Sequence, residues 1–289
     1  MFSRALLCTS LVSLCAFFVG AGASAELPGS TASEQNTSES GANEPSTPTP
    51  INKEKLAEKF HNYNAGCFEL LDCSSGKVFR YNPEQCAKRL PPMSTFKIFN
   101  SLAGLESGVL KDENHLMKWD GQKRWNDSWN KDQTLQSAVS NSVVWYFQKV
   151  AEGVGEGRMK KYLAAANYGN QDISGGITKF WLASSMQISA DEQVQFVKKL
   201  YSDELPFSKR SIEIVKKITE LKSTEKGDLH GKTGSDMQND KWILGWFVGY
   251  VVHNKHAYVF ATNVQADDGV SGPKAKELTI GILEEAGLL

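Results

Sequence analysis

The stretch WILGWFVGYVV, residues 242–252, gives the clearest indication of the fold. Its apolar side chains occupy both odd and even positions, so a strand made from it would bury both of its faces. That pattern is typical of a strand at the centre of a sheet that is covered on both sides. The segment Tyr258–Thr262 follows across a polar turn at His253–His256, and it predicts an antiparallel neighbour.

Both ends of the chain contribute to the predicted sheet. Residues 68–71 and 78–81 flank a Ser-Ser-Gly turn and predict a hairpin. A helix is expected before the hairpin, over residues 52–62, and a closing helix over residues 274–286. The sheet is therefore expected to combine strands that are far apart in the sequence.

The middle of the chain is predicted to be mostly helical, from Thr95 to about Thr219, with loops near 111–132 and 168–188. Strands at both ends with helices between them predict an α+β domain. We expect a central antiparallel sheet flanked by helices, with a helical lobe against it. An active site between the sheet and that lobe would follow from this arrangement.

The pattern S-x-x-K occurs five times, beginning at Ser74, Ser94, Ser128, Ser223 and Ser271. The first and the last lie in turn sequences with glycine or proline, where a hydroxyl bonds local backbone. The third and fourth lie in polar surroundings that would leave their lysines solvated and protonated. Only Ser94 follows two prolines and opens an apolar helical pattern, which places Lys97 beside it, one turn along the same face.

Burial would give this pair its chemistry. A serine hydroxyl is a poor nucleophile without an adjacent base. A lysine becomes such a base when desolvation lowers its pKa. The flanking Phe96, Ile98 and Phe99 predict that the turn is buried. The alternative is that Ser94 caps the helix and Lys97 extends to the surface.

Lys232-Thr233-Gly234 precedes the central strand and is expected at an edge of the sheet. The ammonium and the hydroxyl could bind a carboxylate, and the glycine would let the backbone approach closely. Taken alone, the same tripeptide would more often be a simple turn. Ser142, in Ser142-Val143-Val144, offers a second buried hydroxyl within the helical middle. Taken alone, it would be a serine in an apolar helix that bonds back to its own backbone.

Charge and composition exclude several function classes. The formal net charge is −1, so neither a nucleic acid nor an anionic membrane is indicated as a partner. The five histidines are scattered, no His/Cys cluster has metal-ligand spacing, and no phosphate-binding glycine loop is present. Neither a metal nor an organic cofactor is expected. The sequence leaves open whether the protein is a monomer or a homodimer.

The first 50 residues are predicted to lie outside the domain. Residues 1–25 carry one positive charge, an apolar run and small residues ending in Ala23-Ser24-Ala25, which predicts a secretory signal peptide. Residues 26–50 are polar and rich in Ser, Thr, Pro and Glu, so we expect a disordered linker. One domain is expected over 51–289. It contains Cys67, Cys73 and Cys86, and a disulfide between the first and the last is plausible, although the connectivity cannot be deduced.

Taken together, several motifs resemble the class D serine β-lactamases, the oxacillinase family. They are Ser94–Lys97, Ser142-Val143-Val144, Tyr168-Gly169-Asn170, Phe180-Trp181-Leu182 and Lys232-Thr233-Gly234. The resemblance covers residues 55–286 in the family's order and spacing. It implies a secreted, periplasmic enzyme with a β-lactamase/transpeptidase-like fold that hydrolyses β-lactam antibiotics and confers resistance to them.

The resemblance also implies a role for each matching residue. Ser94 would be acylated, and Lys97 would be the general base after N-carboxylation by CO₂. Ser142 would pass a proton to the leaving nitrogen. The indole of Trp181 would donate to the carbamate, and Val144 and Leu182 would keep the pocket apolar. The remaining implied residues are substrate-binding: Lys232, Thr233 and Gly234, with Ser235, whose backbone N–H would form an oxyanion hole with that of Ser94.

One position departs from the family. An arginine near the start of the last helix often grips the substrate carboxylate, and Ala275 stands there in this chain. Carboxylate binding would then rest on Lys232 and Thr233, with or without a neighbouring lysine, and the sequence does not identify what replaces the arginine. Three alternatives stay open: a penicillin-sensing receptor domain that acylates without turnover, a transpeptidase or carboxypeptidase acting on peptidoglycan, and a pseudoenzyme that only binds cell-wall fragments. The substrate spectrum cannot be read from the sequence.

Overall fold

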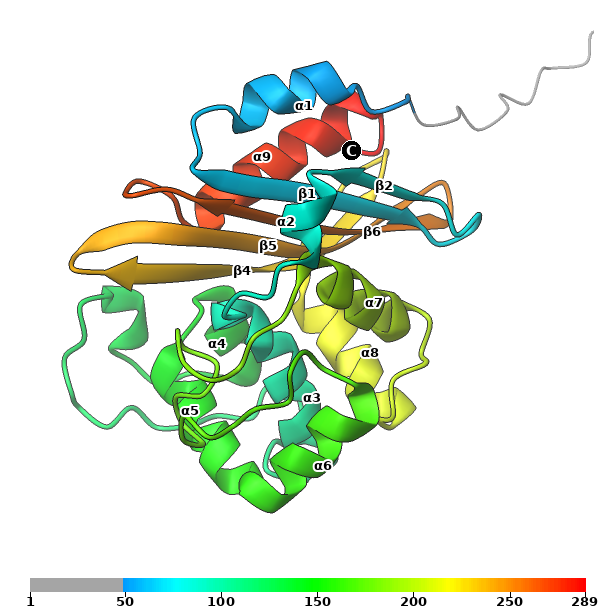
Figure 1. Cartoon of the computed structure of the whole chain (residues 1–289). Coiled ribbons are helices and arrows are strands. Elements are labelled where there is room, and N and C mark those ends of the chain that lie inside the picture. Colours follow the sequence, from blue (N-terminus) through cyan, green and yellow to red (C-terminus); the bar gives the residue numbers. More distant parts are fainter. Residues whose placement is uncertain (1–48) are drawn as a thin grey trace, which may run out of the picture. The chain divides into compact units, whose positions relative to one another are not determined.

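The computed structural model describes residues 49–289 of the chain (Figure 1). The predicted signal peptide and all but the last two residues of the predicted linker lie outside this range, so they stay predictions. At the start of the described range, the backbone N–H of Thr49 donates to the carbonyl of Ala286. Among residues 49–289, no helix is long and apolar enough to cross a membrane.

A six-stranded antiparallel sheet confirms the predicted fold class. Its order is β2-β1-β6-β5-β4-β3, so the first strand of the chain pairs with the last. The strands are β1 (Ala65–Asp72), β2 (Val78–Tyr81), β3 (Glu220–Ser223), β4 (Asp228–Gln238), β5 (Lys241–His253) and β6 (His256–Gln265). The predicted hairpin is β1–β2, and the predicted central strand is β5.

Strand β5 buries both of its faces, as its sequence predicts. Trp246 and Val248 belong to the core on the side of the helical lobe. Phe247 and Val251, which point the opposite way, belong to the core on the other face. This alternation follows from the two-residue period of a strand.

Helices cover the two faces unequally (Figure 1). On one face lie α1 (Lys53–Phe60) and α9 (Gly272–Glu285), at the positions predicted for the first and last helices. On the other face, α7 (Ala190–Tyr201) packs against β1, β5 and β6, and the helical lobe lies beyond it. The remaining helices are α2 (Pro83–Ala87), η1 (Met93–Phe96), α3 (Lys97–Glu106), η2 (Asp127–Trp129), α4 (Leu135–Ser140), α5 (Val144–Val154), α6 (Glu156–Ala166) and α8 (Lys209–Ile218).

One long strand borders the site. The motif Lys232-Thr233-Gly234 lies within β4, the strand that directly precedes the central strand β5. The short β3 pairs only with residues 228–230 of β4. The rest of β4 faces the helical lobe along an open edge, which agrees with the expected position at a sheet edge, although the bounds of the strand were not predicted. This edge forms one wall of a cleft between the sheet and the helical lobe.

The cysteines of the described domain are free thiols. Cys67 and Cys86 are both fully buried, with the Cys86 thiol beside that of Cys67. Burial, assisted by Cys86, raises the pKa of Cys67 well above its usual value, so it stays protonated. The pairing considered from the sequence is therefore sterically close but not formed in the structure.

Candidate active site

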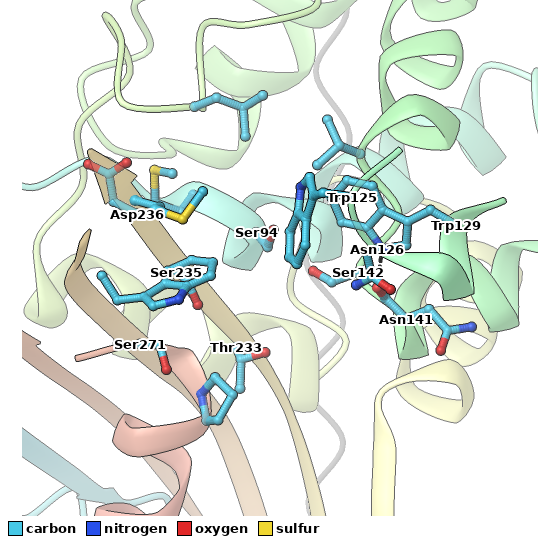
Figure 2. Close-up of a pocket in the computed structure, with 16 residues that line it drawn as sticks. Ser94, Trp125, Asn126, Trp129, Asn141, Ser142, Thr233, Ser235, Asp236 and Ser271 are labelled. Carbon is cyan, nitrogen blue, oxygen red and sulfur yellow. Dashed lines mark hydrogen bonds between the residues drawn. The ribbon is translucent and has the colours of Figure 1, made fainter. Parts of the chain in front are cut away.

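A cleft of about 520 Å³ lies between β4 and the helical lobe, where the sequence predicted an active site. Figure 2 shows Ser94 and Ser142 facing the cleft from the helical side, and Thr233 and Ser235 lining it from β4. Ser271, the N-cap residue of α9, also lines the cleft. Hydroxyl groups from four separate segments therefore meet in one cavity.

Ser94 lies in the 3-10 turn η1, not in the α-helix that the sequence predicted there. The preceding residue, Met93, has a positive φ of 51°, which is costly for a side chain of this size. Its N–H donates to the carbonyl of Trp181 at 3.1 Å. Backbone strain of this kind persists only where the surroundings fix the conformation.

Two further contacts hold the turn in place. The indole N–H of Trp246, on β5, donates to the carbonyl of Pro91 at 3.0 Å. The side-chain amide of Gln193, on α7, donates to the hydroxyl of Thr95 at 2.8 Å. The sheet and α7 thus position the nucleophile before any ligand binds.

Lys97 is the first residue of α3 and is fully buried. Its Nζ lies 2.5 Å from Ser94 Oγ and 3.2 Å from Ser142 Oγ. Burial, and then the nearby charge of Lys232, lowers its pKa well below the usual value. A neutral amine beside a serine hydroxyl can accept its proton.

The other four S-x-x-K lysines do not share this environment. Lys77, Lys131 and Lys226 are exposed, and Lys274 is ion-paired with Glu277 at 3.0 Å. Of the five S-x-x-K lysines, Lys97 alone is fully buried, which distinguishes the Ser94 pair from the other four as the sequence predicted.

Ser142 is not helical, which corrects the sequence prediction. It lies in the short joint between α4 and α5, with a positive φ of 54°. Freed from a helix, its hydroxyl lies 3.1 Å from Lys232 Nζ and 3.2 Å from Lys97 Nζ. One hydroxyl therefore connects both lysines of the site.

Lys232 reaches this joint from β4. Its side chain is 5% exposed, and burial, followed by the charge of Lys276, lowers its pKa to about 7. Its ammonium also donates to the carbonyl of Thr233 at 3.1 Å. At neutral pH this lysine can exchange a proton readily.

The rest of the substrate-facing strand is packed closely. A Cβ at Gly234 would lie 2.9 Å from the carbonyl of Pro92, so glycine lets β4 approach the turn that holds the nucleophile. Ser235 Oγ accepts the N–H of Gly272 at 2.8 Å, which ties β4 to the start of α9. Val144 and Leu182 line the cleft as expected.

Trp181 is fully buried, and its indole N–H has no hydrogen-bond partner in the described residues. Its ring stacks on Phe96 at 5.4 Å, beside the turn of Ser94. An unpartnered buried donor costs about 1–3 kcal/mol. A group with acceptor oxygens on Lys97, such as a carbamate, fits this arrangement because it would give the donor a partner.

Tyr168-Gly169-Asn170 begins the segment 167–189 between α6 and α7, which we call the strap. The side-chain amide of Asn170 donates to the carbonyl of Ser185 at 2.8 Å, and its backbone N–H donates to Gln187 at 2.9 Å. These bonds close the strap on itself, with Trp181 and Leu182 between them. The motif thus supports the site without facing the cleft.

Ala275, where the family often has an arginine, is fully buried. Of the two adjacent lysines, Lys274 is occupied by Glu277, whereas Lys276 lines a small hollow together with Lys232 and Thr233. Lys276 is therefore the neighbouring lysine that is placed to act near the cleft.

Sequence reasoning missed the aromatic wall of the cleft. Trp125 and Trp129, from the loop before α4, and Trp242, at the start of β5, all line the cavity (Figure 2). Met237 at the end of β4 completes the wall. The available signal was the density of tryptophans in a polar loop, because exposed aromatic side chains often mark binding surfaces.

Comparisons with known proteins agree with this geometry. The family model of the penicillin-binding protein transpeptidase domain matches residues 42–284. "Probable beta-lactamase YbxI" of Bacillus subtilis (strain 168) is 43% identical over 83% of this chain and 87% of that protein. "Regulatory protein BlaR1" of Bacillus licheniformis is 36% identical over 83% of this chain but only 40% of its own length. The crystal structure of a class D β-lactamase from Bacillus subtilis matches with a TM-score of 0.78 and 42% identity, over 83% of this chain and 99% of that one.

Proposed function

Because the chain belongs to the class D serine β-lactamases and is a β-lactam hydrolase, we propose that Ser94 forms the acyl-enzyme and that N-carboxylated Lys97 is the general base. One observation carries this proposal: a fully buried lysine amine lies 2.5 Å from the serine hydroxyl. An amine kept neutral by burial can take a proton from Ser94 directly. It can also react with CO₂, releasing one proton.

Two features of the chain support carboxylation at Lys97. Its amine is fully buried, and the buried indole N–H of Trp181 has no hydrogen-bond partner among residues 49–289. When present, the carbamate supplies an anionic base that titrates closer to neutral pH than an ordinary amine. Val144 and Leu182 keep the surrounding cleft apolar, which excludes bulk water from the modified lysine.

In the proposed acylation, Ser94 Oγ bonds to the lactam carbonyl carbon as its proton passes to the base at Lys97. The backbone N–H groups of Ser94 and Ser235 stabilise the oxyanion. The lactam C–N bond then breaks, and Ser142 Oγ donates a proton to the leaving nitrogen. The proton taken up at Lys97 then passes to Ser142 Oγ, 3.2 Å from Lys97 Nζ, which restores the hydroxyl and frees the base for deacylation. Lys232, 3.1 Å from the same hydroxyl, holds it in position by a hydrogen bond.

Deacylation repeats the sequence with water as the nucleophile. Water gives its proton to the base at Lys97 and bonds to the acyl carbon. The bond from that carbon to Ser94 Oγ breaks, the serine regains a proton, and the ring-opened acid leaves. Lys232 and Thr233 hold the substrate carboxylate throughout, and Gly234 keeps β4 close to the nucleophile.

We further propose that the protein is secreted to the periplasm and confers resistance there. The support is the signal-like sequence of residues 1–25, which lies outside the described structure.

The test is turnover of benzylpenicillin by the purified protein, with and without bicarbonate, beside Lys97→Ala. We expect multiple turnovers that bicarbonate enhances and that the variant loses by at least about 100-fold, the usual lower range for a general base. Activity should also fall on the acidic side, because protonation of Lys97 removes the neutral amine. In ¹³C-bicarbonate, NMR should show a carbamate resonance that Lys97→Ala lacks; turnover without that resonance would reject carboxylation.

The match to BlaR1 favours one second candidate, a sensor domain that is acylated and stays so. The same experiment separates the two functions. A single stoichiometric burst that leaves a stable adduct on Ser94 would identify a sensor, whereas sustained product release identifies a hydrolase.

A further inference from the structure

Asp236 places a carboxylate inside the cleft, where the proposed mechanism does not use it. Of the described residues that line this cavity, it is the one with an acidic or basic side chain. Figure 2 shows it on β4 beyond Ser235, on the far side from Thr233. The aspartate is 6% exposed, so its charge is largely shielded from water. The cleft proposed to accept an anionic substrate therefore also contains a negative charge.

The carboxylate of Asp236 is incompletely paired. Its Oδ2 accepts a hydrogen bond from Gln238 Nε2 at 2.9 Å, and its Oδ1 has no hydrogen-bond partner within residues 49–289. In the same range, no lysine, arginine or histidine lies within ion-pair distance of it. A carboxylate can accept about four hydrogen bonds, and a buried charge without a counter-charge is unfavourable. A cationic donor on a ligand would supply the missing partner.

An irregularity in the sheet lies beside this side chain. The register between β4 and β5 shifts between Asp236 and Met237. In a regular strand neighbouring side chains point to opposite faces, whereas a β-bulge can re-aim one of them. Asp236 and Met237 both line the cleft, together with Trp242, the partner of Met237 on β5. The carboxylate therefore adjoins the aromatic wall of the cleft.

The order of residues along β4 indicates which part of a substrate meets Asp236. In the proposed mechanism Thr233 binds the substrate carboxylate, and the backbone N–H of Ser235 stabilises the oxyanion. Successive residues advance about 3.3 Å along a strand. Asp236 and Met237 thus lie beyond the acyl centre, away from the carboxylate end, where the acylamino side chain of a penicillin extends. In ampicillin the carbon between the aryl group and the amide carries an amine, and in carbenicillin it carries a carboxylate.

We propose that Asp236 is a specificity-determining residue that favours β-lactams with a cationic amine on the acylamino side chain and disfavours those with an anion there. The inference rests on the proposed function, because an acyl centre at Ser94 orients the substrate along β4. The ammonium group donates to Asp236 Oδ1 and compensates the buried charge. A carboxylate on the same carbon is repelled. Asp236 takes no part in bond making or proton transfer, so it acts on substrate selection alone.

The test compares three penicillins that differ at one carbon: benzylpenicillin, ampicillin and carbenicillin. The value of kcat/KM is measured for each at pH 6.5, where an α-amine is mostly protonated, with bicarbonate present. Because the three share one lactam, the state of the base at Lys97 cancels in their ratios. In Asp236→Asn, kcat/KM for ampicillin relative to benzylpenicillin should fall about 10-fold, as expected for one lost charge-assisted hydrogen bond. The ratio for carbenicillin relative to benzylpenicillin should rise.

Two variants of the same hairpin are matched controls. Gln238→Ala removes the hydrogen bond to Asp236 but keeps the charge. Asp240→Asn removes a negative charge from the exposed turn, outside the cleft. Both should leave the two ratios near those of the parent. Equal changes in Gln238→Ala would assign the effect to the shape of the hairpin, and equal changes in Asp240→Asn would assign it to net charge. Either outcome overturns the proposal, as do unchanged ratios in Asp236→Asn.

A binding measurement separates this inference from the proposed function. In a Ser94→Ala background, the Kd of each penicillin can be measured by calorimetry without turnover. Asp236→Asn should weaken the binding of ampicillin about 10-fold relative to that of benzylpenicillin. If this shift in Kd occurs but the parent does not turn over benzylpenicillin, the proposed function is rejected and the role of Asp236 stands. If the parent turns over and the Kd ratio does not change, the role of Asp236 is rejected alone.

Discussion

Trp125 shows how a single side chain can shape selectivity here. It is 68% exposed, and its ring lies 5.4 Å from Trp129 and 6.3 Å from Trp242, which joins the loop before α4 to β5 across the cleft. We expect Trp125→Ala to raise KM for benzylpenicillin by about 2- to 10-fold, since an aromatic contact contributes about 0.5–1.5 kcal/mol. KM for 6-aminopenicillanic acid, which has no aryl group, should change little in the same initial-rate assay.

Leu116 provides the matched control for this prediction. It lies earlier in the same loop, is 51% exposed and does not line the cleft. Leu116→Ala should leave both KM values unchanged. If Trp125→Ala raised KM equally for both substrates, the ring would be shaping the loop rather than contacting the aryl group.

At this scale the sequence identified residue types better than conformations. Ser94, Lys97 and Lys232 could be singled out because several motifs occur together in the order of a known family, although each motif alone had a simple structural alternative. The positive φ values of Met93 and Ser142 could not be predicted, because strain of this kind is imposed by tertiary contacts. The aromatic wall was missed because nothing in a loop sequence states which surface it will face.

At the scale of an element, the strap depends on a glycine. Gly169 has a φ of 52°, and a Cβ there would lie 2.4 Å from the carbonyl of Gln187. Gly169→Ala should therefore displace the strap and Trp181 with it. We expect kcat for benzylpenicillin to fall at least about 10-fold. The bicarbonate concentration needed for half-maximal activity should rise. The circular dichroism spectrum should stay that of the parent, which would show that the fold is retained.

A second glycine of the strap, Gly176, serves as a control that tests the effect of positive φ without a steric clash. Gly176 also has a positive φ, 95°, but no atom lies within 4 Å of a Cβ built there. Gly176→Ala should cost stability while leaving the bicarbonate requirement near that of the parent. Equal bicarbonate requirements in the two variants would show that Trp181 does not depend on this packing.

Element prediction succeeded where periodicity was strong. The double-sided apolar run of β5 and the hairpin β1–β2 were both recognisable. Strand β4 was expected only at its Lys-Thr-Gly motif, and its full length was not predicted, because its polar residues weaken the apolar pattern. The exposed, four-residue β3 carried no pattern at all. Short turns such as η1 depend on their neighbours more than on their own residues.

At the scale of the whole molecule, a buried acid couples stability to pH. Glu69, on β1, is fully buried, with Arg80 Nη2 3.2 Å from its carboxylate and Asp191 beside it. Burial, and then Asp191, raises the pKa of Glu69 to about 9. Between its usual value and pH 9 the folded state binds one more proton than the unfolded state, so stability falls as pH rises through this window.

Glu69→Gln should remove most of that dependence, because the amide keeps the shape without the titration. At pH 8.5 we expect the melting temperature of the variant to exceed that of the parent by roughly 2–4 °C for each kcal/mol of unfolding free energy regained. The difference in melting temperature should shrink towards pH 5. Glu225→Gln, at an exposed turn, is the control. A parent whose melting temperature is constant from pH 5 to 9 would contradict the assignment.

The arrangement of the whole sheet was predictable only in part. Its antiparallel class and its assembly from both ends of the chain followed from the order of the elements. The strand order did not, because pairing between β1 and β6 depends on packing that no local pattern encodes. The short helix α2 and the joint at Ser142 could not be predicted either, because their conformations depend on the larger elements that they connect.

The pairing of β1 with β6 also governs when the protein can fold. These strands are neighbours in the sheet but are separated in the chain by the whole helical lobe, so the centre of the sheet cannot close until the last strand has been synthesised. Such non-local pairing makes folding slow. A nascent chain with this topology therefore stays incompletely folded for as long as the β5–β6 hairpin near its C-terminus is missing.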